Sequence, residues 1–288
     1  MQHKRLVSEI ARSLLPLVVV FLASMLGCTD TGKISADLAK GHAKFLLQEA
    51  NKDVEQIQKG MPKGAKILQQ VFEGGEPMDV QKSSEALERA RGKTYELRLA
   101  KSTFFALVEP SGKVIRNDQE QDQMAGKNMF RSYPDLKKVA QGKSVETRGS
   151  MPEAAGVRGK PDAQWVVGVP VESKGEVAAL YVTGWSWSAY AYRLETALRS
   201  DILSKTKEGG KVPLTYVYVI VGNQCYGAPI SPTVNAQAIL KQKPLSQAKS
   251  NEPFAVPLEI ENRQFGLAVV PLEKLGKDVG IAVLRSET

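Results

Sequence analysis

The sequence predicts an α+β protein in which a long N-terminal helix precedes two tandem modules, each an antiparallel sheet of about five strands with a short helix. The helix is predicted because, from Ile34 onward, apolar residues recur at helical spacing with charged residues between them. The modules are predicted by an internal repeat at residues 164–176 and 264–279. Both copies read Gln, an aromatic residue, an apolar run, Pro, an aliphatic residue, Glu, and then Gly before another apolar strand.

The first 27 residues are typical of a signal peptide and are left out of the fold. A basic start precedes an apolar run, residues 14–23, that is too short to span a bilayer comfortably and contains a proline. The small residue before Cys28 resembles the lipobox of bacterial lipoproteins, although Met25 and Leu26 depart from its usual pattern. We therefore expect export, with Cys28 lipidated at the membrane; plain cleavage and an uncleaved anchor are the alternatives.

Residues 28–101 form the predicted N-terminal helical region. Apolar residues from Ile34 to Ile57 fall near one stripe, and the Gly-Met-Pro sequence at 60–62 predicts a break in the long helix. Helical pattern resumes at 83–90. The heptad register is not sustained, which argues against a coiled coil.

The first module is predicted at 102–188, a connecting helix at 189–212 and the second module at 213–288. The predicted strands of the first module are 103–109, 113–116, 145–148, 164–171 and 176–187, with a short helix at 133–141. Those of the second include 214–221, 254–260, 264–270 and 279–284, with a helix near 234–241. Short glycine-containing turns fit antiparallel neighbours. The aromatic residues of 185–192 are expected to pack the junction between the fifth strand and the connecting helix.

A β-β-α-β-β-β unit has the element order of PAS-like sensor folds. The hairpin sequence FFALVEPSGKVI, residues 104–115, resembles the first hairpin of extracellular Cache domains. The sequence AGKNMFRSYP, residues 125–134, resembles the Gly-Lys-Asn loop and short helix of that family. The long helix and the second module resemble the double-Cache arrangement, which implies a small-molecule ligand in the first, membrane-distal module.

The resemblance implies ligand-facing positions at Arg131, Tyr133 and Trp165. Arg131 would pair with a carboxylate, and the two aromatic residues would wall the ligand. The alternatives are an exposed ion-paired Arg131 and a Trp165 that is plain core, as Phe265 would be at the equivalent repeat position. The Arg-x-Trp-Tyr run of amino-acid-binding double-Cache sensors is absent, so an α-amino acid ligand is not predicted.

Composition argues against catalysis and metal binding. The 288 residues carry two histidines and two cysteines, of which only His42 and Cys225 lie beyond Cys28. A histidine triad, a multi-histidine metal site and, with Cys28 acylated, an internal disulfide are therefore not expected. The net charge of +8 is mixed along the chain and indicates a solvated basic surface more than an anionic partner. No enzyme activity, cofactor or nucleic-acid partner is predicted.

These features predict an exported, lipid-anchored sensor or accessory protein that binds a small molecule in its first module. No output module follows the last strand, so we expect the signal to pass to a membrane or periplasmic partner. The alternative is a structural or interaction lipoprotein of the envelope that has a Cache-like fold and no ligand.

Overall fold

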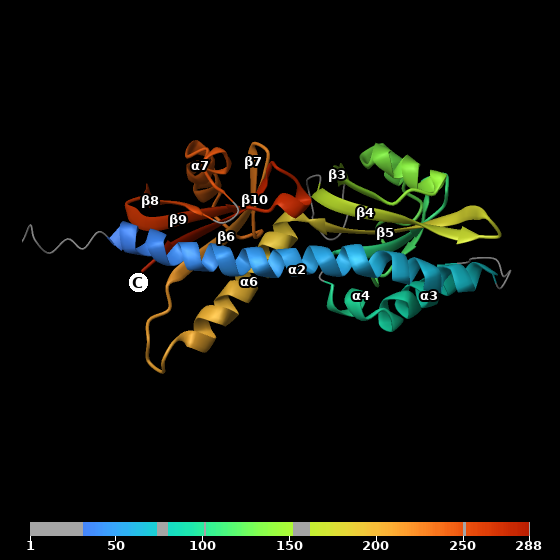
Figure 1. The fold of residues 1–288 in the computed structure, drawn as a ribbon, viewed down its shortest axis with the longest axis horizontal. Helices are drawn as coiled ribbons and strands as arrows, with labels where there is room; N and C mark the ends of the chain where they lie inside the picture. The colour runs from blue at the N-terminus through green and yellow to red at the C-terminus, as the bar shows by residue number, and fades with distance from the viewer. Residues whose placement is uncertain (1–30, 74–79, 101, 152–161, 250–251, 288) are drawn as a thin grey trace, which may run out of the picture.

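The computed structural model describes residues 31–73, 80–100, 102–151, 162–249 and 252–287. The predicted signal peptide, residues 1–27, and Cys28 lie outside these ranges. Figure 1 shows the long helix α2 (Thr31–Glu73) running lengthwise beside two sheets that lie side by side along it. None of the helices among the described residues is long and apolar enough to cross a membrane.

The first module contains a five-stranded antiparallel sheet with the strand order β2-β1-β5-β4-β3. Its strands are β1 (Phe104–Val108), β2 (Val114–Asn117), β3 (Val145–Met151), β4 (Asp162–Ser173) and β5 (Glu176–Ser186). The segment between β2 and β3 forms helix α5 (Met129–Ser132) and the 3₁₀ helix η1 (Pro134–Gln141). Both lie on the face of the sheet that α2 does not cover (Figure 1).

The second module repeats this topology, with the strand order β7-β6-β10-β9-β8. Its strands are β6 (Leu214–Val221), β7 (Gln224–Gly227), β8 (Phe254–Ile260), β9 (Arg263–Pro271) and β10 (Val279–Ser286). Helix α7 (Thr233–Lys241) covers its outer face. The short 3₁₀ helix η2 (Pro244–Ser246) follows α7 in the chain, and η3 (Glu273–Leu275) lies between β9 and β10. The α+β fold with two tandem modules is therefore confirmed, whereas the domain boundaries at 102, 189 and 213 stay a prediction.

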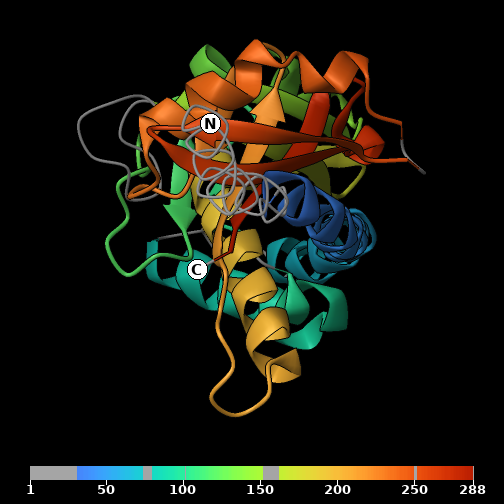
Figure 2. The same cartoon turned by 90° about the vertical axis from the view of Figure 1, so that its left-hand side faces the viewer.

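Helix α6 (Trp187–Lys205) connects the modules, and α3 (Val80–Lys93) and α4 (Tyr95–Leu99) pack beside α2. The end view in Figure 2 shows α6 projecting away from the sheets on the side of α2. One apolar core runs along α2 and includes residues from both sheets and α6. Two smaller cores lie on the opposite sheet faces, one under α5 and η1 and one under α7.

The predicted break of the long helix at residues 60–62 is wrong, because α2 continues through Pro62. Pro62 is exposed, and its ring removes only one hydrogen bond from a long helix. The neighbouring glycines are buried against α4 instead. A Cβ atom would lie 2.6 Å from Leu97 Cδ2 at Gly60 and 2.8 Å from Leu97 Cδ1 at Gly64. These glycines mark a close helix contact and not a helix end.

The repeat is offset by one residue from the alignment that the sequence suggests. Trp165 packs in the core along α2, whereas Phe265 packs in the core under α7, so the two side chains lie on opposite faces of their sheets. Counting back from the prolines at positions 170 and 271, the counterpart of Trp165 is Gly266. Because side chains alternate along a strand, a one-residue shift exchanges the faces.

Candidate functional site

The structure places Arg131 and Tyr133 in the segment that covers the outer face of the first sheet. Asn128 caps α5, its side-chain Oδ1 accepting a hydrogen bond from the backbone N–H of Phe130 at 2.9 Å. Arg131 is exposed. Tyr133 is fully buried, and its hydroxyl donates a 2.8 Å hydrogen bond to Oε1 of Gln164 on β4. Tyr133 is thus held against the sheet, while Arg131 faces solvent.

Buried side chains fill the space between this segment and the sheet. Met129, Leu136 and Val139 come from the covering helices and are fully buried. They pack against β-strand side chains and the ring of Tyr133 in one apolar cluster. The face where the resemblance implies a ligand is therefore densely packed around Tyr133.

Trp165 lies on the other face of the same sheet. Its ring centroid is 4.5 Å from that of Trp185, and Trp185 in turn stacks on Tyr190 of α6 at 4.2 Å and 5°. Trp185, Trp187 and Tyr190 are buried, which confirms that these three aromatic residues pack the junction, whereas Tyr192 is 54% exposed and the expectation is wrong for it. The structure does not bring Trp165 together with Arg131 and Tyr133, and a ligand role for these three residues stays a prediction.

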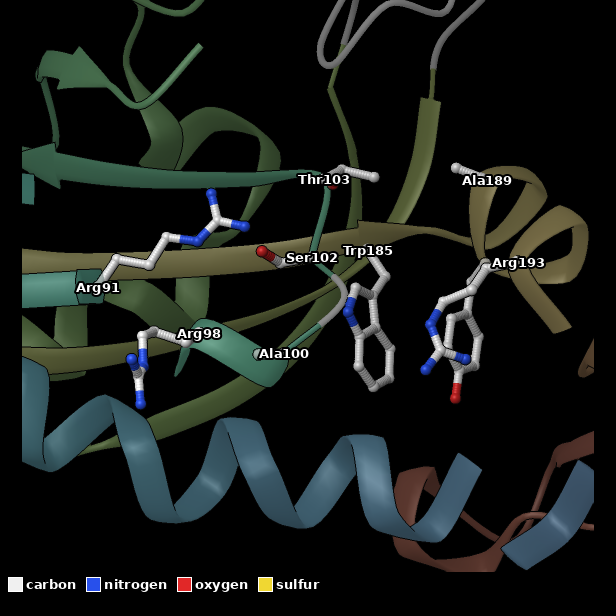
Figure 3. Close-up of a pocket in the computed structure, with 9 residues that line it drawn as sticks. Arg91, Arg98, Ala100, Ser102, Thr103, Trp185, Ala189 and Arg193 are labelled. Carbon is white, nitrogen blue, oxygen red and sulfur yellow. The ribbon is translucent and has the colours of Figure 1, made fainter. Parts of the chain in front are cut away.

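A pocket of about 190 Å³ opens beside the stacked rings of Trp185 and Tyr190. We call it the arginine pocket, because three arginines and no acidic residue line it. Its lining residues are Arg91, Arg98, Ala100, Ser102, Thr103, Trp185, Ala189, Tyr190 and Arg193. Figure 3 shows Arg91 and Arg98 on one side, Arg193 on the other and Trp185 between them.

Local structure fixes the wall that carries the aromatic rings. The backbone N–H of Thr103 donates to the carbonyl of Gly184 at 2.8 Å, and its hydroxyl donates to the same carbonyl at 2.6 Å. Ser186 caps α6 by accepting a hydrogen bond from the N–H of Ala189 at 3.4 Å. One helical turn later, Tyr190 and Arg193 lie on the same side of α6, because residues three apart are neighbours on a helix.

An ion pair ties α6 to α2 behind the pocket. Arg193 Nη2 donates to Asp53 Oδ1 at 2.6 Å, and the Tyr190 hydroxyl donates to Asp53 Oδ2 at 3.2 Å. Asp53 is 2% exposed. Burial, and then the Asp53 charge, raises the pKa of Tyr190 well above its usual value, so this phenol stays protonated and donating. The network holds two pocket residues in place.

The other two arginines differ in their partners. Arg91 pairs with Asp118 at 3.0 Å and lies over the ring of Phe105. Arg98 lies over the exposed ring of Tyr95 and makes no ion pair with any of the residues that the structure describes. Arg98 thus supplies a positive charge that no carboxylate of the described chain offsets.

Neither His42 nor Cys225 belongs to the arginine pocket. His42 contacts Arg285, and burial, followed by the Arg285 charge, lowers its pKa. Burial raises the pKa of the Cys225 thiol to about 12, which leaves it without thiolate character at neutral pH. Among the described residues, no group of His, Cys, Asp and Glu could hold a metal ion. The pocket's groups can bind and orient a ligand, and they include no pairing of nucleophile and base.

No known family profile matches the chain, and no curated protein matches it. Solved structures do share its fold. The domain of a Vibrio parahaemolyticus protein described as a sensory box/GGDEF family member has a TM-score of 0.57 at 8% identity, over 90% of this chain and 98% of that one. The extracellular domain of a protein described as a histidine kinase also has 0.57, at 9% identity over 90% and 93%. A methyl-accepting chemotaxis protein has 0.53, at 16% identity over 89% and 98%.

Proposed function

We propose that this protein is an exported, lipid-anchored sensor or accessory protein of double-Cache type, which binds a small molecule in its first module and signals through a partner. The observation that carries the proposal is the repeated strand order in two sheets beside one long helix, with a pocket where the first sheet meets the helices that precede and follow it. The similar structures named above come from proteins whose descriptions are sensory. Their likeness supports the fold, and the sensory role is the proposal.

A thermal-shift screen of the purified protein against metabolites and ions tests ligand binding. A specific ligand raises the melting temperature, because binding to the folded state alone stabilises it by mass action. We expect at least one small molecule to do so in a concentration-dependent way. If no compound shifts the melting temperature, and a crystal structure shows a filled first-module interior, ligand sensing is wrong.

The anchor has a separate test, because Cys28 lies outside the described residues and only its sequence supports lipidation. Cells expressing the protein can be labelled with a palmitate analogue and fractionated. We expect label and membrane association in the wild type and loss of both in Cys28→Ser. Equal labelling of the variant would reject lipidation at this residue.

The second candidate function is a structural or interaction lipoprotein without a ligand. It is favoured by the dense packing around Tyr133, where the Cache resemblance implies a ligand. Pull-down from the native envelope, with Arg131→Ala as a comparison, separates the two. A scaffold should capture the same partner in both forms and with or without added metabolites, whereas a sensor's partner should respond to its ligand.

A further inference from the structure

The arginine pocket contains buried hydrogen-bond donors that no group in the described part of the chain satisfies. Trp185 is 1% exposed, and its indole Nε1 has no hydrogen-bond partner there. Arg193 uses Nη2 for Asp53, while its buried Nε and Nη1 have none. Buried polar groups in folded proteins nearly always have partners, so these orphaned donors indicate a missing acceptor.

Each of these three unpartnered atoms, Trp185 Nε1, Arg193 Nε and Arg193 Nη1, is a donor. An indole N–H can only donate, and a guanidinium has five donors and no acceptor. The lining adds Arg98, which has no ion pair among the described residues, and it contributes no carboxylate. Arg193 and Arg91 already pair with Asp53 and Asp118, so Arg98 is the pocket charge that a neutral ligand or a cation would leave without a partner. The chemistry that satisfies this set is an oxyanion, which accepts charge-assisted hydrogen bonds from arginine.

Size and surface restrict the anion further. The pocket volume of about 190 Å³ lies below the ~300–1,000 Å³ that is usual for drug-sized ligands. The stacked rings of Trp185 and Tyr190 form an apolar wall beside the arginines. A ligand with one charged end and a small apolar body fits both features.

We infer that the arginine pocket binds a small acid through its carboxylate or phosphate group, with Arg193 Nε and Nη1 and Trp185 Nε1 as the donors and Arg98 as an added positive charge in the lining. This inference rests on the function proposed above, because it names the class of small molecule that the sensor binds, at the edge of the first module. Such a ligand contacts α4 on one side and α6 on the other. It therefore connects the helices that precede the first sheet with the helix that leads to the second module.

Calorimetric titration with inorganic phosphate, succinate and benzoate tests the inference and separates phosphate from carboxylate ligands. Arg98→Gln is the main variant, because Arg98 is exposed and holds no structural ion pair. We expect at least one probe to bind the wild type and to bind Arg98→Gln about threefold more weakly, because the variant removes an exposed positive charge that has no partner among the described residues. Trp185→Phe keeps the ring and removes Nε1, and we expect it to weaken the same probe by at least about threefold.

Two further variants serve as controls for charge and for position. Arg89→Gln removes an exposed arginine of α3 that does not line the pocket, and Arg131→Gln removes the exposed arginine on the other sheet face. Arg89→Gln should bind as the wild type does. Arg131→Gln compares the two candidate ligand positions, and it should keep binding if the ligand lies in the arginine pocket. Equal weakening by Arg89→Gln would show a general charge effect and overturn the inference.

The outcomes also separate this inference from the proposed function. If only Arg131→Gln loses binding, the ligand lies under α5 and η1, so the sensor proposal stands and the arginine pocket is wrong. If none of the three probes binds the wild type but the thermal-shift screen finds a neutral ligand, the anion inference fails alone. If neither experiment finds binding, both fail.

Discussion

The two modules share a strand order, but at one pair of facing strand positions their residues differ strongly in size and charge. In the first sheet, Trp165 on β4 lies opposite Trp185 on β5. At the counterpart of this pair in the second sheet, Gly266 on β9 lies opposite Arg285 on β10. Two large aromatic side chains in one module therefore correspond to a glycine and an arginine in the other.

This difference sets how closely α2 approaches each sheet. A Cβ atom at Gly266 would lie 2.0 Å from the backbone nitrogen of Ala36, so α2 packs directly on the sheet there. In the first module, the paired tryptophans occupy the same face and extend the stack to Tyr190 of α6, beside the arginine pocket. One topology thus yields a close helix contact in one module and an aromatic-walled pocket in the other.

We expect the largest loss of stability from Gly266→Leu, which puts a large side chain where the second module has a glycine. The new side chain would meet the α2 backbone at Ser35 and Ala36, and a backbone cannot move aside as a flexible side chain can. We expect the free energy of unfolding to fall by about 4 kcal/mol or more, at the upper end of overpacking effects. Chemical denaturation followed by circular dichroism measures this change.

Gly41→Leu is the control. Gly41 lies in α2, the helix that Gly266 contacts, and a Cβ atom at Gly41 would meet nothing within 4 Å. This variant should be neutral or more stable by up to about 1 kcal/mol, since glycine is a poor helix former. Equal stability of the two variants would contradict a close contact between α2 and the second sheet.

The next effect tests the tie between α2 and the arginine pocket. Asp53→Ala leaves Arg193 without its 2.6 Å partner and Tyr190 without its acceptor. We expect a loss of about 3 kcal/mol in unfolding free energy, because breaking a buried ion pair leaves an uncompensated charge. Thermal and urea denaturation both report it.

Asp37→Ala is the control on the same helix. Asp37 pairs with Lys40 at 2.8 Å, but its side chain is 64% exposed. An exposed pair of this kind contributes ~0–1 kcal/mol, so this variant should resemble the wild type. If Asp53→Ala is equally mild, Asp53 does not hold α6 in place.

Helical periodicity predicted the long helix, and an internal repeat predicted the two modules, because both patterns can be read directly from the sequence. The predicted break at Pro62 failed for a tertiary reason, since Gly60 and Gly64 accommodate Leu97 of α4. Local pattern could not show that α4 would return to this point on α2. Glycine in a helical pattern can mark a close approach of another element as well as a helix end, and here it marks a close approach.

The candidate site was harder still to predict from local sequence patterns. The sequence placed Tyr133 correctly in the segment that covers the first sheet, yet it grouped Tyr133 with Trp165, which faces the other way. The arginine pocket was not predicted, because Arg91, Arg98 and Arg193 belong to three different helices. The aromatic residues of 185–192 were the one local signal, and packing explained them equally well.

A smaller effect distinguishes a structural from a ligand-binding Tyr133. Tyr133→Phe removes the 2.8 Å hydrogen bond to Gln164 and keeps the ring in the apolar cluster. We expect a loss of about 1 kcal/mol in unfolding free energy, a typical net value for one hydrogen bond. Tyr192→Phe, at a 54% exposed position, should change nothing. If Tyr133 is structural, a ligand found by screening should bind Tyr133→Phe as tightly as it binds the wild type. Weaker binding to Tyr133→Phe would support the predicted ligand role of the Tyr133 hydroxyl.

The smallest expected effect is a pH dependence of stability at Arg285, the second-module counterpart of Trp185. Arg285 lies 2.6 Å from His42, and burial, followed by the Arg285 charge, lowers the pKa of this histidine below its usual 6.5. Asp201 and Glu287 oppose the shift, while Lys205 adds to it. As the pH falls through about 6.5, the unfolded chain takes up a proton before the folded one does, so stability decreases.

His42→Gln keeps an acceptor for Arg285 and removes the titration. Between pH ~7.5 and ~5.5, we expect the wild type to lose more unfolding free energy than this variant. Urea denaturation at both pH values measures the difference. Equal losses would mean that His42 has the same pKa in the folded and unfolded chain. An excess loss in the wild type would show that Arg285, the second-module counterpart of Trp185, makes a proton-sensitive contact with His42 of α2.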